Sequence, residues 1–423
     1  MKRTISALWI MMMLSALAAA QSRAGAASAD LSPATQTVAA AQKAISEKPA
    51  EYAGYNFLAT ALVRRAQETS DVSFYAQAED AVEKSLAMAP NNFESEKIRV
   101  VILLGEHEYP AALKAATALN QKVPDDVMVY GLLTEANVAL GNYEDAEDSA
   151  QWMLNLRRGN RPAFIRAAGL REIFGDAEGA YEMIDLAFQS TPANETEERA
   201  SILTQMGHFR LASGNADAAE KLLQQALTTL PGYPPALGNL AQLRIGQKRY
   251  AEAVALLQQR YQVVPRADNL YDLAEALQLA GREDEAKRAF TDFESRALLE
   301  SEKKDNSNRN LVFYYADHAQ QPAKALTVAR QEYAWRHDVY TLDAYAWALH
   351  VNGQNAEARE QIESALAVGI RDAKLFLHAG EIALRVGDVP AAKGYFKQAA
   401  ELDTADSEQA RSLLSSLSGP FGR

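Results

Sequence analysis

The histidines are the side chains in this sequence best suited to metal binding or proton transfer, and they are few and scattered. There are six: His107, His208, His318, His337, His350 and His378. No two of them are four residues apart, so no helix would present a histidine pair to zinc. His107-Glu108 begins like a zinc-protease motif, but Ala111 stands where the second histidine should be. The sequence therefore predicts no metal site.

Nucleophilic and phosphate chemistry have equally little support. The chain has no cysteine, and neither the Gly-x-x-x-x-Gly-Lys nor the Gly-x-Ser-x-Gly motif occurs. Asp317-His318, or Tyr345 with His350, could transfer protons, but no nucleophile accompanies them. A catalyst with a cryptic site is the least favoured interpretation. We expect no enzyme activity and no cofactor.

Composition and charge limit the kinds of partner. The chain has 423 residues, 48% of them hydrophobic, which is enough to build a packed structure. Its 43 lysines and arginines face 55 aspartates and glutamates, a formal net charge of −12. Phosphate contacts need basic side chains, so this balance argues against a nucleic-acid partner.

The first residues have the pattern of a secretory signal. Lys2-Arg3 precedes the apolar run Ile5–Leu17, and small residues at Ala18–Ala20 and Ala27–Ala29 offer two cleavage sites. The run is shorter than the roughly 20 residues that span a bilayer, which favours cleavage over an uncleaved anchor. We expect an exported protein, periplasmic or extracellular, with no stable membrane span after cleavage.

Prolines mark a repeat along the rest of the chain. Pro90, Pro124, Pro192, Pro231 and Pro265 each end an apolar helical run, at intervals of 34, 68, 39 and 34 residues. A proline cannot continue a helix, so these positions indicate helix ends at a fixed phase. The 68-residue interval fits two units, the first ending without proline.

Each interval predicts two helices joined by a turn with glycine or asparagine, as at Gly141, Gly214 and Gly281. Small residues recur once in each helix, where antiparallel helices would cross closely. In the first helix they are Ala168, Gly207, Ala241, Ala274, Ala346 and Gly380. In the second they are Ala146, Ala180, Ala219, Ala253, Ala286, Ala358 and Ala392.

This 34-residue helix-turn-helix spacing resembles the tetratricopeptide repeat family over about residues 50–403. The match is clearest in ALGNYEDAE (139–147), LASGNADAAEKLLQQALTTLP (211–231) and RVGDVPAAKGYFKQAAELD (385–403). The resemblance implies an all-α fold, an α-solenoid of about ten hairpins forming a right-handed superhelix. It also implies that the first helix of each unit lines the concave surface.

The repeat is not uniform along the chain. A polar segment interrupts the apolar rhythm near residue 300, and the next unit is short between Ala316 and Ala325. The predicted organisation is a signal peptide at 1–29, a leading helix at 30–49, units 1–7 at 50–299, a polar joint at 300–310, units 8–10 at 311–403, and a capping helix and tail at 404–423.

The resemblance also indicates which side chains would face a groove. In the last three units the candidates are Phe313, Asp317, Tyr340, Asp343, Trp347, His350, Glu381 and Arg385. Earlier units add, among others, Glu172, His208, Tyr271 and Glu275. The alternative is that the rings pack between hairpins. As groove residues, they predict that Trp347→Ala with Asp343→Lys abolishes partner capture without disturbing the fold.

The resulting functional hypothesis is a non-catalytic interaction scaffold of the cell envelope. Its partner would be a protein or peptide, and the acidic bias favours a basic or mixed segment. The chaperone-tail clamp of some family members is not matched, because only Asn56 falls at a fitting position. The alternative is an accessory or substrate-capture subunit of an envelope enzyme, secretion or transport complex.

Overall fold

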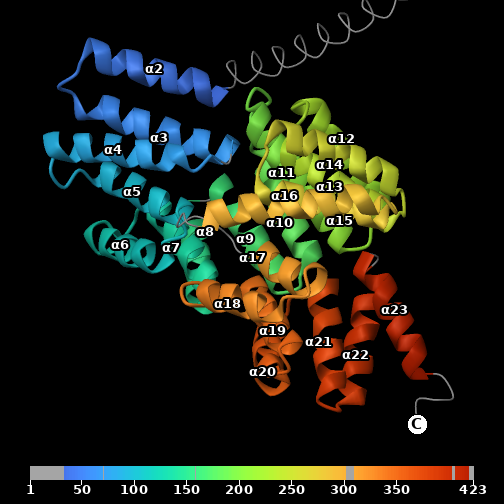
Figure 1. The fold of residues 1–423 in the computed structure, drawn as a ribbon. Helices are drawn as coiled ribbons and strands as arrows, with labels where there is room; N and C mark the ends of the chain where they lie inside the picture. Colours follow the sequence, from blue (N-terminus) through green and yellow to red (C-terminus); the bar gives the residue numbers. More distant parts are fainter. Residues whose placement is uncertain (1–32, 70, 158, 302–308, 403–404, 419–423) are drawn as a thin grey trace, which may run out of the picture. The chain divides into compact units, whose positions relative to one another are not determined.

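The computed structural model describes residues 33–69, 71–157, 159–301, 309–402 and 405–418 (Figure 1). The predicted signal peptide and most of the polar joint lie outside the described residues. Within the described ranges the secondary structure is helical and no strand occurs. The all-α prediction is confirmed.

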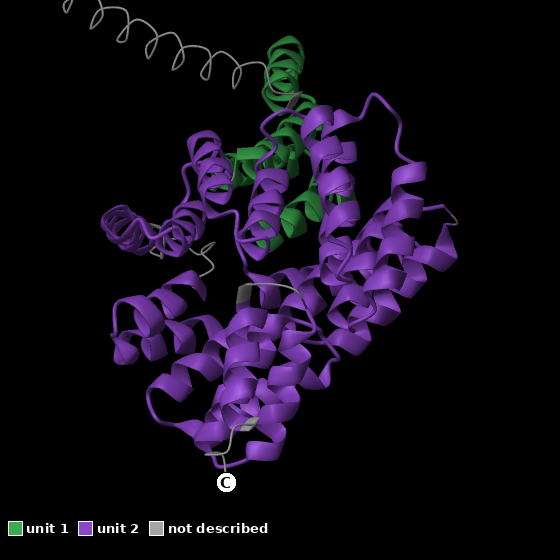
Figure 2. Ribbon diagram, turned by 90° about the vertical axis from the view of Figure 1, so that its right-hand side faces the viewer, with its two compact units in different colours: residues 1–105 green, residues 106–423 purple. Residues whose placement is uncertain are grey.

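The chain divides into two compact units, residues 1–105 and 106–423 (Figure 2). The described helices of the first unit are α2 (Pro33–Glu47), α3 (Tyr52–Thr69), α4 (Ser73–Met88) and α5 (Phe93–Gly105). Helix α2 is the predicted leading helix. The division falls between α5 and α6, inside the second predicted repeat.

The second unit begins with α6 (Tyr109–Lys122), α7 (Val127–Leu140), α8 (Tyr143–Leu156), α9 (Arg161–Ile173), α10 (Ala177–Gln189), α11 (Thr196–Ala212), α12 (Ala216–Thr229), α13 (Pro234–Gly246), α14 (Tyr250–Val263), α15 (Ala267–Leu279) and α16 (Glu283–Ser301). It continues with α17 (Arg309–Phe313), the π-helical turn η1 (Tyr314–His318), α18 (Pro322–Tyr333), α19 (Val339–Val351), α20 (Asn355–Ala367), α21 (Ala373–Arg385), α22 (Val389–Ala400) and α23 (Ala405–Ser418). Successive helices pack as hairpins, from α7 with α8 to α21 with α22.

Small residues allow the two helices of each hairpin to pack closely. Ala241 and Ala253, which cross in the hairpin of α13 and α14, are fully buried. In the last hairpin, a Cβ added to Gly380 would lie 2.3 Å from the ring of Phe396. The crossing positions expected from the repeat pattern are therefore places where a larger side chain has no room.

The turns inside the hairpins use the left-handed backbone conformation that glycine adopts without strain. Gly214 and Gly281 have φ angles of 77° and 70°. At the matching positions of other hairpins, Lys248 and Gln320 adopt φ angles of 60° and 52° although they carry side chains.

The eighth predicted repeat, which is shorter than the others, has an unusual first helix. Helix α17 continues into η1, where Ala319 N donates a hydrogen bond to Tyr314 O at 2.8 Å, five residues back. This wider turn precedes a connection in which Gln321 N donates to Tyr315 O at 2.7 Å. The short spacing between Ala316 and Ala325 thus corresponds to a π-helical turn.

Two glycines in the last hairpin should respond oppositely to substitution. Gly380→Ala should destabilise the protein by about 1–3 kcal/mol, because the new methyl group overlaps the Phe396 ring. Gly394, in α22, has no atom within 4 Å of its added Cβ, so Gly394→Ala should stabilise by about 0.5–1 kcal/mol. Urea denaturation of both variants measures the difference. Equal shifts would contradict the crossing assignment.

Candidate functional site

Trp347, on α19, lies at the centre of the predicted groove residues. Its ring is stacked between two histidines, with centroid distances of 5.0 Å to His350 and 4.1 Å to His378. Its Nε1 donates a hydrogen bond to Asp317 Oδ1 at 2.7 Å, which joins α19 to η1. Trp347 is only 9% exposed, so most of the ring packs within the repeats and its edge points to the acidic side chain.

Asp343 lies in the interior. It is 2% exposed, and His378 Nδ1 is 2.7 Å from its Oδ1. The pair connects α19 to α21, so this carboxylate faces a histidine rather than solvent. The expectation that Asp343→Lys with Trp347→Ala leaves the fold undisturbed is therefore wrong, because it would bury a lysine ammonium where the carboxylate partner of His378 lies.

The other groove candidates differ in exposure. Phe313 is buried, and Lys374 Nζ lies 3.9 Å from the centroid of its ring. Tyr340 is half-buried beneath the guanidinium of Arg309, at 5.5 Å. Asp317 and Arg385 are exposed, and Glu381 and His350 are half-buried.

Four carboxylates act electrostatically on Lys374, at the start of α21. Burial by itself lowers the pKa of this lysine, but attraction to the carboxylates outweighs burial and raises it. The carboxylates come from four different elements: Glu275 on α15, Asp317 on η1, Asp343 on α19 and Asp406 on α23. Two of them also pair with histidines, Asp343 with His378 and Glu275 with His318. Carboxylates therefore outnumber lysines in this part of the second compact unit.

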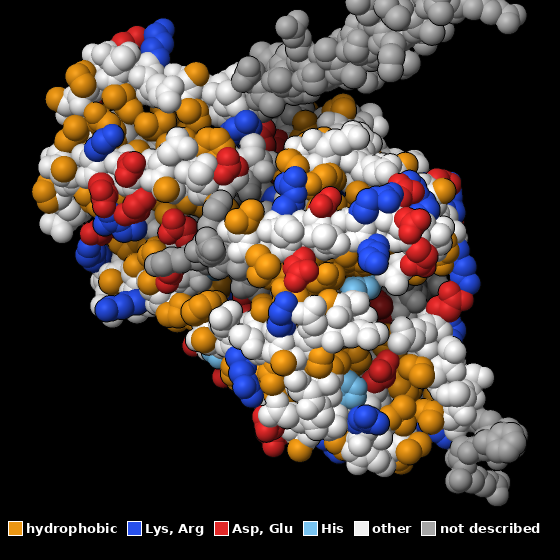
Figure 3. All heavy atoms as spheres, viewed as in Figure 1, with side chains coloured by type: hydrophobic (Ala, Val, Ile, Leu, Met, Phe, Trp, Pro, Cys, Tyr) orange, Lys and Arg blue, Asp and Glu red, His pale blue; other side chains and the backbone are white. Residues whose placement is uncertain are grey.

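We define the inner surface as the surface formed by Glu275, Asp317, Trp347, Lys374 and Glu381. Figure 3 shows histidine and acidic side chains together in a hollow between α15 and α21. The arrangement offers carboxylates beside aromatic rings. Such a surface suits a cationic side chain with an apolar stem, as in lysine or arginine.

Carboxylate–histidine pairs connect neighbouring first helices elsewhere in the second unit. Glu172 on α9 pairs with His208 on α11, 36 residues later. Glu275 on α15 lies 3.5 Å from His318 on η1 and accepts a hydrogen bond from Tyr271 Oη at 3.0 Å. These pairs occupy the same face as the pair on α19 and α21.

The sequence-based prediction missed Lys374, His318 and His378 as members of this site. A usable signal was present: an acidic residue is followed by a histidine 35 or 36 residues later in two of the pairs. That separation is close to one repeat, so the two side chains occupy the same place on neighbouring helices.

Within the described ranges, no three histidine, aspartate or glutamate side chains group in a way that could hold a metal ion. Among the helices of the described ranges, none has the length and apolar character to cross a membrane.

Comparisons with known proteins identify a repeat in the middle of the chain. Residues 210–260, from the end of α11 into α14, match the tetratricopeptide repeat family. A relative from Xanthomonas axonopodis pv. citri (strain 306), called cellulose synthase operon protein C, is 34% identical over 107 residues. That match covers 25% of this chain and only 7% of the relative.

Solved structures with a related arrangement are distant in sequence. Human IFIT1, solved as a dimer with PPP-AAAA, has a TM-score of 0.49 and 14% identity, covering 83% of this chain and 90% of that one. Yeast Tom70 has a TM-score of 0.41 and 13% identity, covering 90% and 91%. PilW, a type IV pilus biogenesis factor, has a TM-score of 0.42 and 16% identity, covering 49% and 94%.

The buried pair on α19 and α21 should be important for stability. Asp343→Ala leaves the buried His378 ring without its hydrogen-bond partner and should cost about 1–3 kcal/mol. Asp317→Asn keeps an oxygen acceptor for Trp347 and should change stability by less than about 1 kcal/mol. Urea denaturation compares the two; similar stabilities would show that the Asp343–His378 pair contributes little.

The Glu172–His208 pair should make stability depend on pH. Burial lowers the pKa of His208, but its hydrogen bond to Glu172 and that group's charge raise it overall. The pair's contribution is therefore complete below the unfolded-state pKa of about 6.5 and is lost as pH rises through the higher folded-state pKa. His208 keeps 46% of its side chain exposed, so the effect should be small.

The melting temperatures of the wild type and Glu172→Gln, at about pH 6 and about pH 9, test this expectation. The difference between the two proteins should be larger at the lower pH. Glu178→Gln is the matched control, because Glu178 pairs with Arg210 across α10 and α11 and arginine does not titrate in this range. A pH-dependent difference in the control would mean that His208 is not the responsible group.

Proposed function

The chain is a tetratricopeptide-repeat protein, and we propose that it is a non-catalytic scaffold that holds a basic protein segment on its inner surface. Repeats of this family generally mediate protein–protein interaction. The observation that carries the proposal is the set of carboxylates on the first helices of different repeats, Glu275, Asp317 and Glu381, of which Asp317 is exposed. A partner with spaced lysines or arginines would complement these carboxylates.

We place this scaffold in the cell envelope, exported through the signal at residues 1–29. The support is the basic start, the apolar run and the small residues that follow it in the sequence. Cell fractionation and N-terminal sequencing of the mature protein test this placement. Recovery from the cytoplasm with Met1 or Lys2 as the first residue would contradict it.

A second candidate function is an accessory or substrate-capture subunit of an envelope complex. One observation favours it: the relative with 34% identity over 107 residues is called cellulose synthase operon protein C. In this case the pure protein should bind a polymer such as a cello-oligosaccharide. The scaffold should instead bind a basic peptide, so titration with both probes separates the two functions.

The inner surface should bind a labelled peptide of alternating lysine and serine, and charge neutralisation should weaken the binding. Asp317→Asn with Glu381→Gln removes two negative charges and should raise Kd about tenfold, which corresponds to about 1.4 kcal/mol. Fluorescence anisotropy measures the affinity. Added salt should weaken binding further, because both charges are accessible.

The matched control is Glu144→Gln with Asp145→Asn at the exposed start of α8. It removes the same net charge from another surface and should leave Kd nearly unchanged. An equal loss in the control, or equal binding of a peptide of glutamate and serine, would overturn the proposal for the inner surface.

A further inference from the structure

Two parts of the second unit that are distant in the sequence meet at the turn between α7 and α8. His337 N donates a hydrogen bond to Ala139 O at 3.0 Å. Val339 N donates to Tyr143 Oη at 2.9 Å, across 196 residues of sequence. The turn glycine between them, Gly141, lies so close that an added Cβ would be 2.7 Å from His337 O.

The same relation occurs one repeat later, at the turn between α9 and α10. A Cβ added to Gly175 would lie 2.3 Å from Gly369 O, in the loop before α21. In the other direction, a Cβ added to Gly369 would lie 3.0 Å from Phe174 O. By contrast, the turn glycines Gly214 and Gly281 have no neighbouring atom within 4 Å of an added Cβ.

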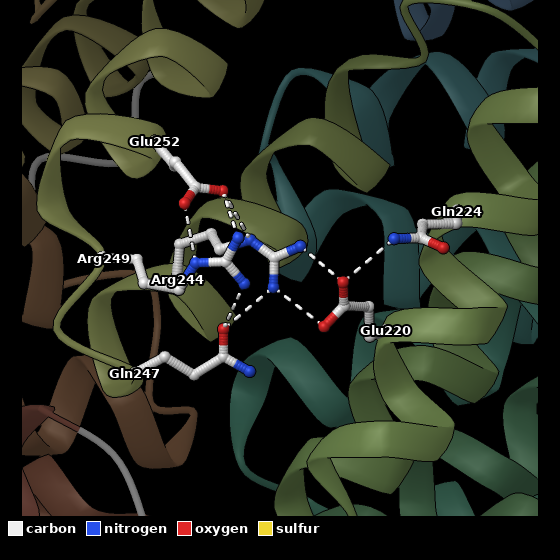
Figure 4. A network of polar contacts seen from close by, with 6 residues as sticks. All are labelled: Glu220, Gln224, Arg244, Gln247, Arg249 and Glu252. Atoms are coloured by element: carbon white, nitrogen blue, oxygen red, sulfur yellow. Dashed lines mark hydrogen bonds and ion pairs between the residues drawn. The ribbon is translucent and has the colours of Figure 1, made fainter.

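A third contact joins the turn between α13 and α14 to α23. Lys248 Nζ lies 2.5 Å from Glu408 Oε1, and these side chains are 62% and 57% exposed. A polar network built on Arg244 supports the turn that carries Lys248 (Figure 4). Arg244 donates to Glu220 at 2.9 and 2.5 Å and to Gln247 at 2.9 Å. Lys248 thus replaces the usual turn glycine and extends its amine to another helix.

These three contacts have the same arrangement, and together we call them the seam. In each contact, the turn of one hairpin meets a helix from much later in the chain. The contact lies at or near the start of that later helix, which is α19, α21 or α23. Figure 1 shows α18 and α19 beside α7 and α8. Tyr143 and Ile173 also pack against the hydrophobic core that contains α15, α19 and α21. The seam therefore connects the last repeats of the second compact unit to earlier repeats of the same unit.

The seam is weaker than the packing within hairpins. Besides the apolar contacts of Tyr143 and Ile173, it consists of two hydrogen bonds, one exposed ion pair and close backbone approaches at glycines. Contacts of these kinds contribute modestly, whereas each hairpin buries continuous rows of apolar side chains. Contacts of the lowest stability open first in a folded protein. The seam is thus the place where the second unit can open without losing its hairpins.

We propose that the seam is a latch that controls access of a protein segment to the inner surface. This inference rests on the proposed function. The loops held by the seam lead directly into α19 and α21, which carry Trp347 and Lys374. Opening the seam would free the starts of these two helices and widen the approach to the carboxylates. A bound segment would in turn favour the open state by its greater affinity for it.

Hydrogen exchange tests the latch without any partner. Gly175→Ala and Gly214→Ala impose the same strain of a left-handed backbone, since φ is 79° and 77°, but only Gly175 touches the seam. We expect Gly175→Ala to accelerate exchange of the Val339 amide and of α19 and α21 about tenfold. Gly214→Ala should leave these amides unchanged. Equal exchange in both variants would overturn the latch.

Crosslinking tests the link to binding and does not depend on the glycine variants. The chain has no cysteine, so Lys248→Cys with Glu408→Cys introduces the only two thiols. A short bismaleimide should lock the seam of the full-length protein, and the same variant capped by a monofunctional maleimide is the unlocked control. The association rate of the lysine–serine peptide should fall about tenfold on locking, as expected when binding requires a conformational change.

The outcomes separate the two proposals. Equal association rates in the locked and capped proteins would overturn the latch and leave the scaffold function intact. Absence of peptide binding in both would overturn the proposed function, and hydrogen exchange would then decide the latch alone.

Discussion

Close approach of helices at positions without bulk is the constraint on which this structure depends. Ala241 and Ala253 are fully buried where α13 and α14 cross, and Gly380 contacts the Phe396 ring in the last hairpin. Because the backbones come this close, larger apolar side chains are left to fill the space between hairpins. Stacking then places the first helices side by side, and this row of helices carries every side chain of the inner surface.

The same geometry explains how charged side chains far apart in the sequence become partners. A position on one first helix has its neighbour about one repeat further along the chain, as in the pairs Glu172–His208 and Asp343–His378. Charges placed with this period become neighbours in space. The acidic groups that attract Lys374 come from four elements but do not follow this period, because the π-helical turn and the α22–α23 connection interrupt it. The excess of carboxylates over lysines is what distinguishes this surface chemically.

The departures from a uniform repeat lie at the π-helical turn and at the seam of the second compact unit. The π-helical turn η1 places Asp317 against the indole of Trp347. Lys248 takes a turn position that is glycine in several other hairpins and pairs with Glu408. Gly141 and Gly175 differ from other turn glycines because a distant loop lies against them. Irregularities in a repeat of this kind therefore mark contacts between repeats that are not neighbours.

The sequence by itself determined the helical class, the hairpin phase and the crossing residues, because a 34-residue period and small side chains are local properties of the chain. It also placed the groove candidates on first helices. It did not determine which candidates are exposed: Asp343 is buried against His378, while Asp317 remains accessible. Nor did it indicate the division after Gly105 or the seam. Those features depend on how far each hairpin rotates against the next, and that rotation is set by packing summed over many repeats.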